Sequence, residues 1–96
     1  MADRTDALTA ELVGESALTL GRAGARLQGA LDALAAHDAA GVANAEARAL
    51  LVDAAGEQAW YFVVLRGAMG WNDEQEALDA YAVPMEVRLR MGVRGR

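Results

Sequence analysis

Apolar residues return along this chain with the period of an α-helix, in two long stretches. In the first, over residues 4–37, bulky residues recur every seven positions and so share one helix face: Val13, Leu20, Leu27 and Leu34. The second, over residues 44–69, has the same period, and a turn around Gly41 separates the two. Gly70 suits the end of the second helix, because glycine adopts the left-handed conformation common at helix C-termini. The pattern predicts two long helices folded back as an antiparallel hairpin.

Two short helices are expected in the last quarter of the chain. Asn72 and Gln75 have the spacing of a capping box, in which two side chains bind free backbone N–H groups at a helix start, and they predict a helix over residues 73–81. Pro84 ends it, because the residue before a proline is pushed out of the α region. The same proline suits the first turn of a fourth helix over residues 84–91.

Glycine and alanine form a seam along the first helix, next to the leucine stripe. An interior glycine costs about 1 kcal/mol relative to alanine, so we expect it where another helix approaches closely. We predict that this seam packs helices together within the chain and in a dimer. The seam residues, with the leucines beside them, are Ala10, Gly14, Ala17, Leu20, Gly21, Gly24, Leu27 and Leu31. The alternative is a break or kink in the helix at Gly14 or Gly21.

The lengths of the two long helices favour a second copy of the chain. A helix over residues 4–37 is about 50 Å long, whereas one over residues 44–69 reaches only about 38 Å. Unless the first helix is broken, part of it stays uncovered in a single chain. The sequence therefore predicts one all-α domain, a long antiparallel helical hairpin with two short C-terminal helices, doubled into a homodimeric four-helix bundle.

Composition matters mainly through what is missing. The 96 residues include no cysteine, no lysine and a single histidine, His37. These absences exclude disulfides, thiolate chemistry, cysteine-based zinc sites and lysine Schiff bases. Ser16, the only serine, has no histidine at helical spacing to activate it. The sequence thus predicts no enzyme, with no catalytic, cofactor-binding or metal-binding residue.

The charge balance weighs against nucleic acid as the main partner. The net charge is −5, although Arg88, Arg90 and Arg94 make the C-terminal end locally basic. That end has the outline of a helix-turn-helix, but Glu86 stands where base contacts would be wanted. The first residues lack an export signal, and no apolar run reaches the roughly 18 residues of a membrane span. We expect a cytoplasmic protein without membrane contact.

Two tryptophans could anchor a partner. The segment of residues 60–65, Trp60-Tyr61-Phe62-Val63-Val64-Leu65, is apolar on every side of its helix, so the short C-terminal helices are expected to cover it. Trp60 and Trp71 are possible partner contacts, since tryptophan is favoured in binding hot spots. The other interpretation is that both fill the junction between the hairpin and the short helices.

The C-terminal third also resembles a family of short, uncharacterised bacterial proteins, found mainly in alphaproteobacteria. The residues that carry the resemblance are Trp60, Val63, Arg66, Ala68 and Gly70, followed by Tyr81, Val83, Pro84, Glu86, Val87, Arg90, Met91 and Gly92. It implies a bacterial origin and carries no activity, cofactor or site.

The combined pattern predicts a non-enzymatic, homodimeric protein that binds another protein or acts as a scaffold. Two alternatives stay open. One is a DNA-associated accessory protein that uses the basic C-terminal end. The other is a helical bundle that binds a small ligand or lipid in a cavity near Trp60, Tyr61 and Phe62.

Overall fold

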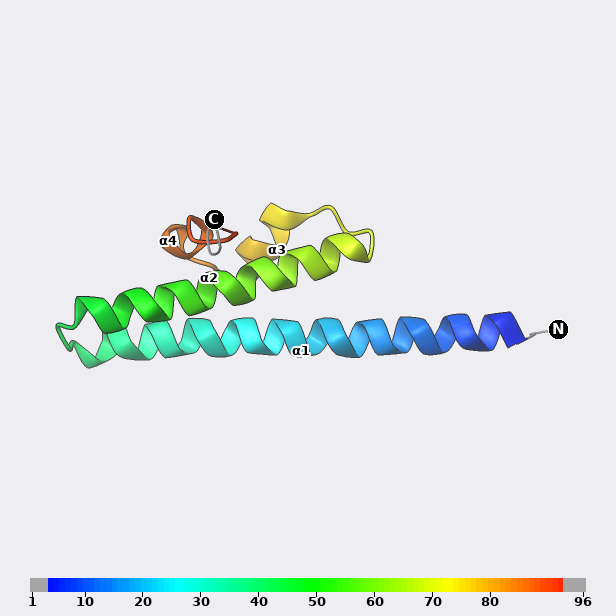
Figure 1. The fold of residues 1–96 in the computed structure, drawn as a ribbon, viewed down its shortest axis with the longest axis horizontal. Coiled ribbons are helices and arrows are strands. Elements are labelled where there is room, and N and C mark those ends of the chain that lie inside the picture. Colours follow the sequence, from blue (N-terminus) through cyan, green and yellow to red (C-terminus); the bar gives the residue numbers. More distant parts are fainter. Residues whose placement is uncertain (1–3, 93–96) are drawn as a thin grey trace.

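A computed structural model describes residues 4–92 of the chain, with the side chains of residue 11 and of residues 14–92. The fold is all-α. Its four helices are α1 (Arg4–Ala40), α2 (Ala45–Ala68), α3 (Glu74–Ala80) and α4 (Met85–Arg88). The two long helices, α1 and α2, form the predicted antiparallel hairpin, and the two short ones lie against α2 (Figure 1).

The first helix is continuous, so the alternative of a break at Gly14 or Gly21 is wrong. It runs for 37 residues, whereas α2 has 24. Its N-terminal turns therefore extend well beyond the end of α2, which makes the molecule long and narrow at 63 × 26 × 23 Å (Figure 1). Isolated interior glycines lower helix propensity by only about 1 kcal/mol each, which a long alanine-rich helix tolerates.

The core lies between α1 and α2 and continues under the two short helices. Leu27 and Leu34 of the predicted stripe are buried, and so is Leu31 of the predicted seam. The side chain of Val13 lies outside the described residues. From the other elements the core receives Val52, Ala55, Ala59, Phe62, Ala77, Leu78, Val83 and Val87.

Both ends of α2 follow local capping rules. At its start, the side chain of Asn44 accepts a hydrogen bond from the backbone N–H of Ala47 at 3.0 Å. At its end, Gly70 has a φ of +90°, and the backbone N–H of Trp71 donates to the carbonyl of Arg66 at 3.0 Å. The predicted role of Gly70 at the end of this helix is confirmed.

The capping box predicted at the start of α3 is wrong. The cap position falls on Asp73, one residue after Asn72, and no side chain caps this helix. The Asp73 carboxylate is instead held by the guanidinium of Arg66, at 2.6 and 3.2 Å. The Gln75 side chain accepts a hydrogen bond from Arg88 at 3.2 Å rather than turning back to the cap. Charge-assisted bonds to arginine are stronger than neutral capping bonds, which accounts for the outcome.

The connection between α3 and α4 turns sharply at Ala82. This alanine has a φ of +52°, a left-handed conformation that usually calls for glycine. The N–H of Val83 donates to the carbonyl of Leu78 at 3.0 Å, which closes a Schellman turn. Pro84 then precedes α4, which spans only Met85–Arg88 and is shorter than the predicted residues 84–91.

Among the described residues, none of the helices combines the length and the apolar character that crossing a membrane requires.

Candidate interaction surfaces

The predicted seam of α1 divides into an inner and an outer part. Leu27 is fully buried, Leu31 nearly so, and Leu20 packs at the margin of the core. These leucines hold α1 against α2 within one chain.

Gly24 is the one seam glycine that meets a close neighbour. A methyl group added at Gly24 would collide with the hydroxyl of Tyr81 and would lie 3.5 Å from the ring of Phe62. The Tyr81 and Phe62 rings are themselves in edge-to-face contact, with centroids 5.1 Å apart. Gly24 therefore makes room for the side chain of Tyr81, at the end of α3, rather than for the backbone of another helix.

The remaining small residues of the seam face outward. A methyl group added at Gly14 or Gly21 would meet no heavy atom within 4 Å, and Ala17 and its neighbour Leu18 are exposed. The side chain of Ala10 lies outside the described residues. These positions pack nothing within the described chain, and their role in a dimer stays a prediction.

Gly56 of α2 lies close to Val87 of α4 and to Arg90, which follows α4. A methyl group added at Gly56 would lie 3.0 Å from the Cβ of Arg90 and 3.3 Å from the carbonyl oxygen of Val87. The signal in the sequence was the glycine itself, within a helix otherwise rich in alanine, but its partner lies more than 30 positions away.

The three consecutive aromatic residues of α2 point into different surroundings. Phe62 is buried beside Tyr81. Tyr61 is half-exposed, with the guanidinium of Arg26 5.6 Å from its ring centroid. Trp60 is half-exposed next to Gly92. Trp60 lines an open hollow, described below, whose lining includes neither Tyr61 nor Phe62.

Both tryptophans stay about half-exposed at the edges of the short helices. One face of the Trp60 ring is covered by Gly92, where an added methyl group would lie 3.5 Å from the ring. The guanidinium of Arg66 lies 5.1 Å from the centroid of a Trp71 ring. Beside Trp60 is an open hollow of about 540 Å³, lined by Leu50, Asp53, Ala54, Glu57, Trp60, Arg90 and Gly92.

The arginines predicted as possible nucleic-acid contacts are engaged inside the chain. The side chain of Arg88 is only 17% exposed and pairs with Asp79 at 2.8 Å. Arg90 pairs with Asp53 of α2 at 2.6 Å. Arg94 lies outside the described residues. Arg88 and Arg90 thus tie the C-terminal segment to α3 and α2.

Arg48 links three elements at the loop end of the hairpin. Its guanidinium donates to Asp38 of α1 at 2.8 and 3.1 Å and to Glu86 of α4 at 2.8 and 2.7 Å. Hydrogen bonding to Arg48 lowers the pKa of both carboxyl groups, and the two carboxylates raise the pKa of Arg48. Sequence reasoning missed this cluster, because nothing in the local spacing connects positions 38, 48 and 86.

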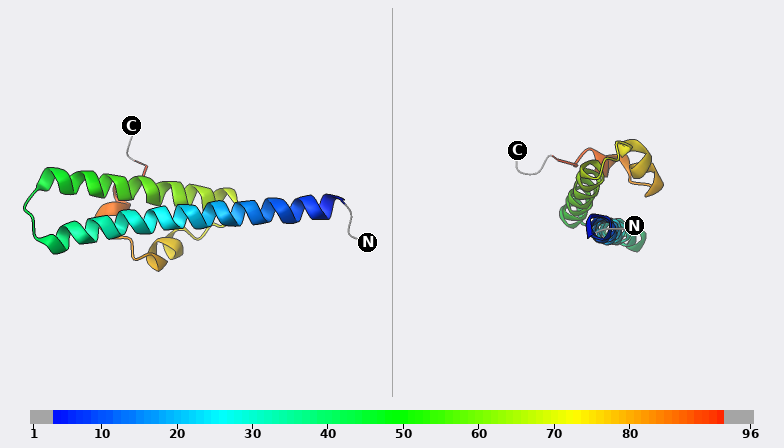
Figure 2. Two further views of the ribbon diagram at one scale, coloured as in Figure 1. Left: turned by 90° about the horizontal axis from the view of Figure 1, so that it is seen from below. Right: turned by 90° about the vertical axis from the view of Figure 1, so that its right-hand side faces the viewer.

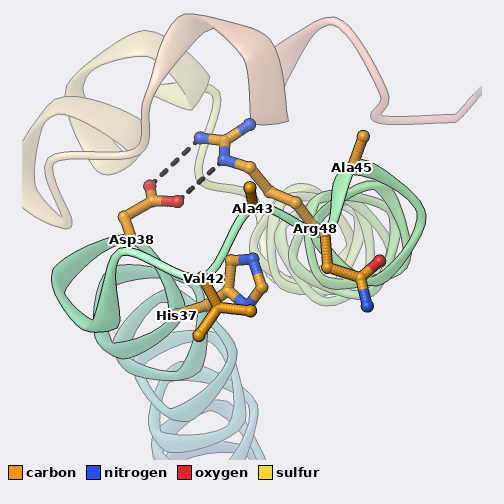
Figure 3. A pocket seen from close by; sticks show the side chains of 7 residues that line it. His37, Asp38, Val42, Ala43, Ala45 and Arg48 are labelled. Carbon is orange, nitrogen blue, oxygen red and sulfur yellow. Dashed lines mark hydrogen bonds and ion pairs between the residues drawn. The ribbon is translucent and has the colours of Figure 1, made fainter.

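A hollow of about 400 Å³ lies at the same end, between α1, the loop and the start of α2. Figure 3 shows the imidazole of His37 beside Val42 and the Asp38 carboxylate bound to Arg48 across the hollow. No three imidazole or carboxylate groups gather for a metal ion anywhere among the described side chains. The charges at this site hold the loop in place.

One side of the hairpin carries no other helix in the described part of the chain. In the end-on view of Figure 2, α3 and the segment after α4 wrap around the right and the top of α2, and the lower left is bare. Arg26 of α1 stacks over Tyr61 of α2, with its guanidinium carbon 5.6 Å from the ring centroid. Leu50 and Val64 of α2 are exposed as well, and with Tyr61 they form an apolar strip along the helix that the polar residues Glu57 and Gln58 interrupt.

Comparison with sequence models of protein families, with curated proteins and with solved structures finds no match. The resemblance of the C-terminal third to short bacterial proteins stays a prediction. Several of its residues make the contacts that join the short helices to the hairpin, including Tyr81 on Phe62, Glu86 on Arg48 and Arg90 on Asp53.

Proposed function

We propose that this protein is a non-enzymatic, homodimeric helical scaffold that acts by presenting surfaces to another protein. The observation that supports this most directly is the apolar strip along α2, on a long hairpin with one bare side. Leu50, Tyr61 and Val64 on this strip are 66%, 43% and 48% exposed. Contiguous apolar surface on a small protein is typical of an interaction site.

The unequal lengths of the long helices also support a second copy. The difference between 37 residues in α1 and 24 in α2 is 13 residues, or about 20 Å of helix. Most helical stability in proteins comes from packing of an apolar face, and in the described part of the chain α2 ends before it can lie against this extension. A second hairpin supplies such a face.

The residue types present in the sequence support a binding role rather than a catalytic one. A nucleophile needs a base within hydrogen-bond reach, and the chain has one serine, one histidine and no cysteine. Four arginines of α2 and the segments after it, Arg48, Arg66, Arg88 and Arg90, form ion pairs that join one element to another.

Light scattering coupled to size exclusion tests the proposal. The chain has a mass of 10.1 kDa, so a homodimer has a mass of about twice that value at micromolar concentration. A monomer mass over the whole micromolar range contradicts the proposal.

A further inference from the structure

We propose that the segment of residues 93–96, Val93-Arg94-Gly95-Arg96, binds in the hollow beside Trp60 and covers it within its own chain. This segment continues the chain from Gly92, the last residue that the structure describes. The proposal adds an intramolecular contact to the surface of α2 and does not depend on the proposed homodimer.

One face of α2 forms the floor of the hollow. The lining residues of this helix recur at the spacing of three or four positions that places side chains on one face. They are Leu50, Asp53, Ala54, Glu57 and Trp60. From Leu50 to Trp60 the floor is about 15 Å long. Both of these end residues are large, apolar and exposed, so the hollow offers apolar surface at each end.

The segment after α4 forms the rim of the hollow. Arg90 is bound to Asp53 at 2.6 Å, and a methyl group added at Gly92 would lie 3.5 Å from the Trp60 ring. Gly92 has a φ of +69°, the left-handed conformation with which a chain changes direction after a helix. Residue 93 therefore starts at the rim, since consecutive Cα atoms are about 3.8 Å apart.

The length of the 93–96 segment matches the floor. Four extended residues span at most about 14 Å, close to the distance from Trp60 to Leu50 along the helix. The segment thus reaches every residue of the floor from its attachment at Gly92. No other part of the described chain continues from the rim of this hollow.

The charges of the segment complement those of the floor. Arg94 and Arg96 carry two positive charges, whereas Asp53 and Glu57 place two carboxylates between the apolar ends of the hollow. A carboxylate accepts several hydrogen bonds, so the bond from Arg90 leaves Asp53 able to accept another. Arginine also stacks on tryptophan rings. Electrostatic attraction and stacking both favour an arginine-rich occupant in this place.

Binding of the segment shields Leu50 and Trp60 in the free protein. A partner that docks on this part of α2 must then displace residues 93–96, which makes the contact autoinhibitory. Because its ion pairs lie at the surface, added salt weakens the contact.

Fluorescence quenching of Trp60 tests the proposal. The chain has two tryptophans, so Trp71→Phe leaves Trp60 as the only one. In this background we expect Arg94→Gln/Arg96→Gln to raise the acrylamide quenching constant at least about 1.5-fold, because the ring loses its cover. Raising the NaCl concentration from 0.05 to about 0.5 M is expected to do the same in the parent but not in the variant.

The matched control is Arg4→Gln/Arg22→Gln, which removes the same charge from α1. We expect it to leave both the quenching constant and its salt dependence unchanged. Equal quenching constants for the parent and Arg94→Gln/Arg96→Gln overturn the proposal. Protection that disappears on dilution assigns the occupant to a second copy and also overturns it. Concentration-independent protection of a monomer supports it while light scattering contradicts the homodimer.

A disulfide gives a second readout that does not depend on fluorescence, because the natural chain contains no cysteine. Ala54→Cys/Gly95→Cys is expected to form an intramolecular disulfide on mild oxidation, which needs Cα atoms within about 7 Å. Glu11→Cys/Gly95→Cys is the control, because Glu11 lies on the part of α1 that extends beyond α2. Mass spectrometry of the alkylated proteins measures both. Equal yields of the two disulfides overturn the proposal.

Discussion

At the scale of single residues, the glycines of the long helices differ by what stands next to them. Gly24 lies under the hydroxyl of Tyr81, whereas Gly14, Gly21 and Gly29 face open space in the described chain. Helix propensity is the same for all of them, so their substitutions separate the propensity effect from the effect of packing.

We expect Gly29→Ala to raise the free energy of unfolding by about 0.5–1 kcal/mol, because the methyl group meets nothing and the unfolded chain loses freedom. Gly24→Ala is expected to lower it by about 1–2 kcal/mol, because the clash with Tyr81 outweighs the gain in propensity. Urea denaturation measures both values. Adding Tyr81→Phe to Gly24→Ala removes the colliding hydroxyl and should recover part of the loss. If the loss is the same without the hydroxyl, Tyr81 is not its cause.

Ala82 shows the opposite situation, a residue in a conformation suited to glycine. Its φ of +52° costs about 1 kcal/mol for a residue with a Cβ atom. Ala82→Gly is therefore expected to raise the free energy of unfolding by about 0.5–1 kcal/mol and, with it, the thermal midpoint. Ala80→Gly, in the last turn of α3, is the control and is expected to lower it. A lower midpoint for Ala82→Gly contradicts the strained turn.

At the scale of elements, ion pairs join the short helices to the hairpin. Arg48 binds the end of α1 and the start of α4 at once, and Arg90 and Arg88 fasten the following segment to α2 and α3. Each short helix is too brief to be stable alone, so its position depends on such contacts and on the buried residues Leu78 and Val87.

The Arg48 cluster predicts an acid-dependent loss of stability. The pKa values of Asp38 and Glu86 lie below their usual values of 3.8 and 4.5 because of Arg48. A pKa that is lower in the folded than in the unfolded state contributes stability that is complete above those usual values and is lost as the pH falls through the lowered ones. We expect the thermal midpoint to fall below about pH 4.5, and to fall less steeply in Arg48→Gln.

The control for this prediction is Arg22→Gln, an exposed arginine of α1 outside the cluster. Thermal melts followed by circular dichroism between neutral and acid pH measure all three proteins. An acid profile of Arg48→Gln parallel to that of the parent contradicts the role of Arg48 in lowering the two pKa values.

At the scale of the whole molecule, α1 extends beyond the end of α2, and one side of the hairpin carries no other helix in the described part of the chain. A radius of gyration of 16.6 Å is well above the roughly 12–13 Å expected of a compact domain of this length. An elongated hairpin buries less apolar surface per residue, so its stability depends more on what binds to it.

If the homodimer forms, thermal stability depends on protein concentration. The midpoint of the parent protein is expected to rise by a few degrees for each tenfold increase in concentration, because association stabilises the folded chain by mass action. Differential scanning fluorimetry over the micromolar range measures it, and a midpoint that is independent of concentration in the parent contradicts the proposed dimer.

The sequence by itself determined the helices and their order. The seven-residue period of Leu27 and Leu34 and the glycine at position 70 act within one or two helical turns, so they can be read from neighbouring positions. The hairpin follows from them, because two apolar faces joined by a short turn can bury themselves only against each other.

Only the tertiary structure decided which partner each residue meets. The side chain of Tyr81 packs on Gly24, and the α4 segment packs on Gly56. Asp73 binds Arg66, and Asn72 does not cap α3. Arg48 joins Asp38 to Glu86. Each of these contacts depends on where an element distant in the sequence packs. That placement is set by packing and charge pairing between residues far apart in the chain, which leave no periodic trace in the sequence.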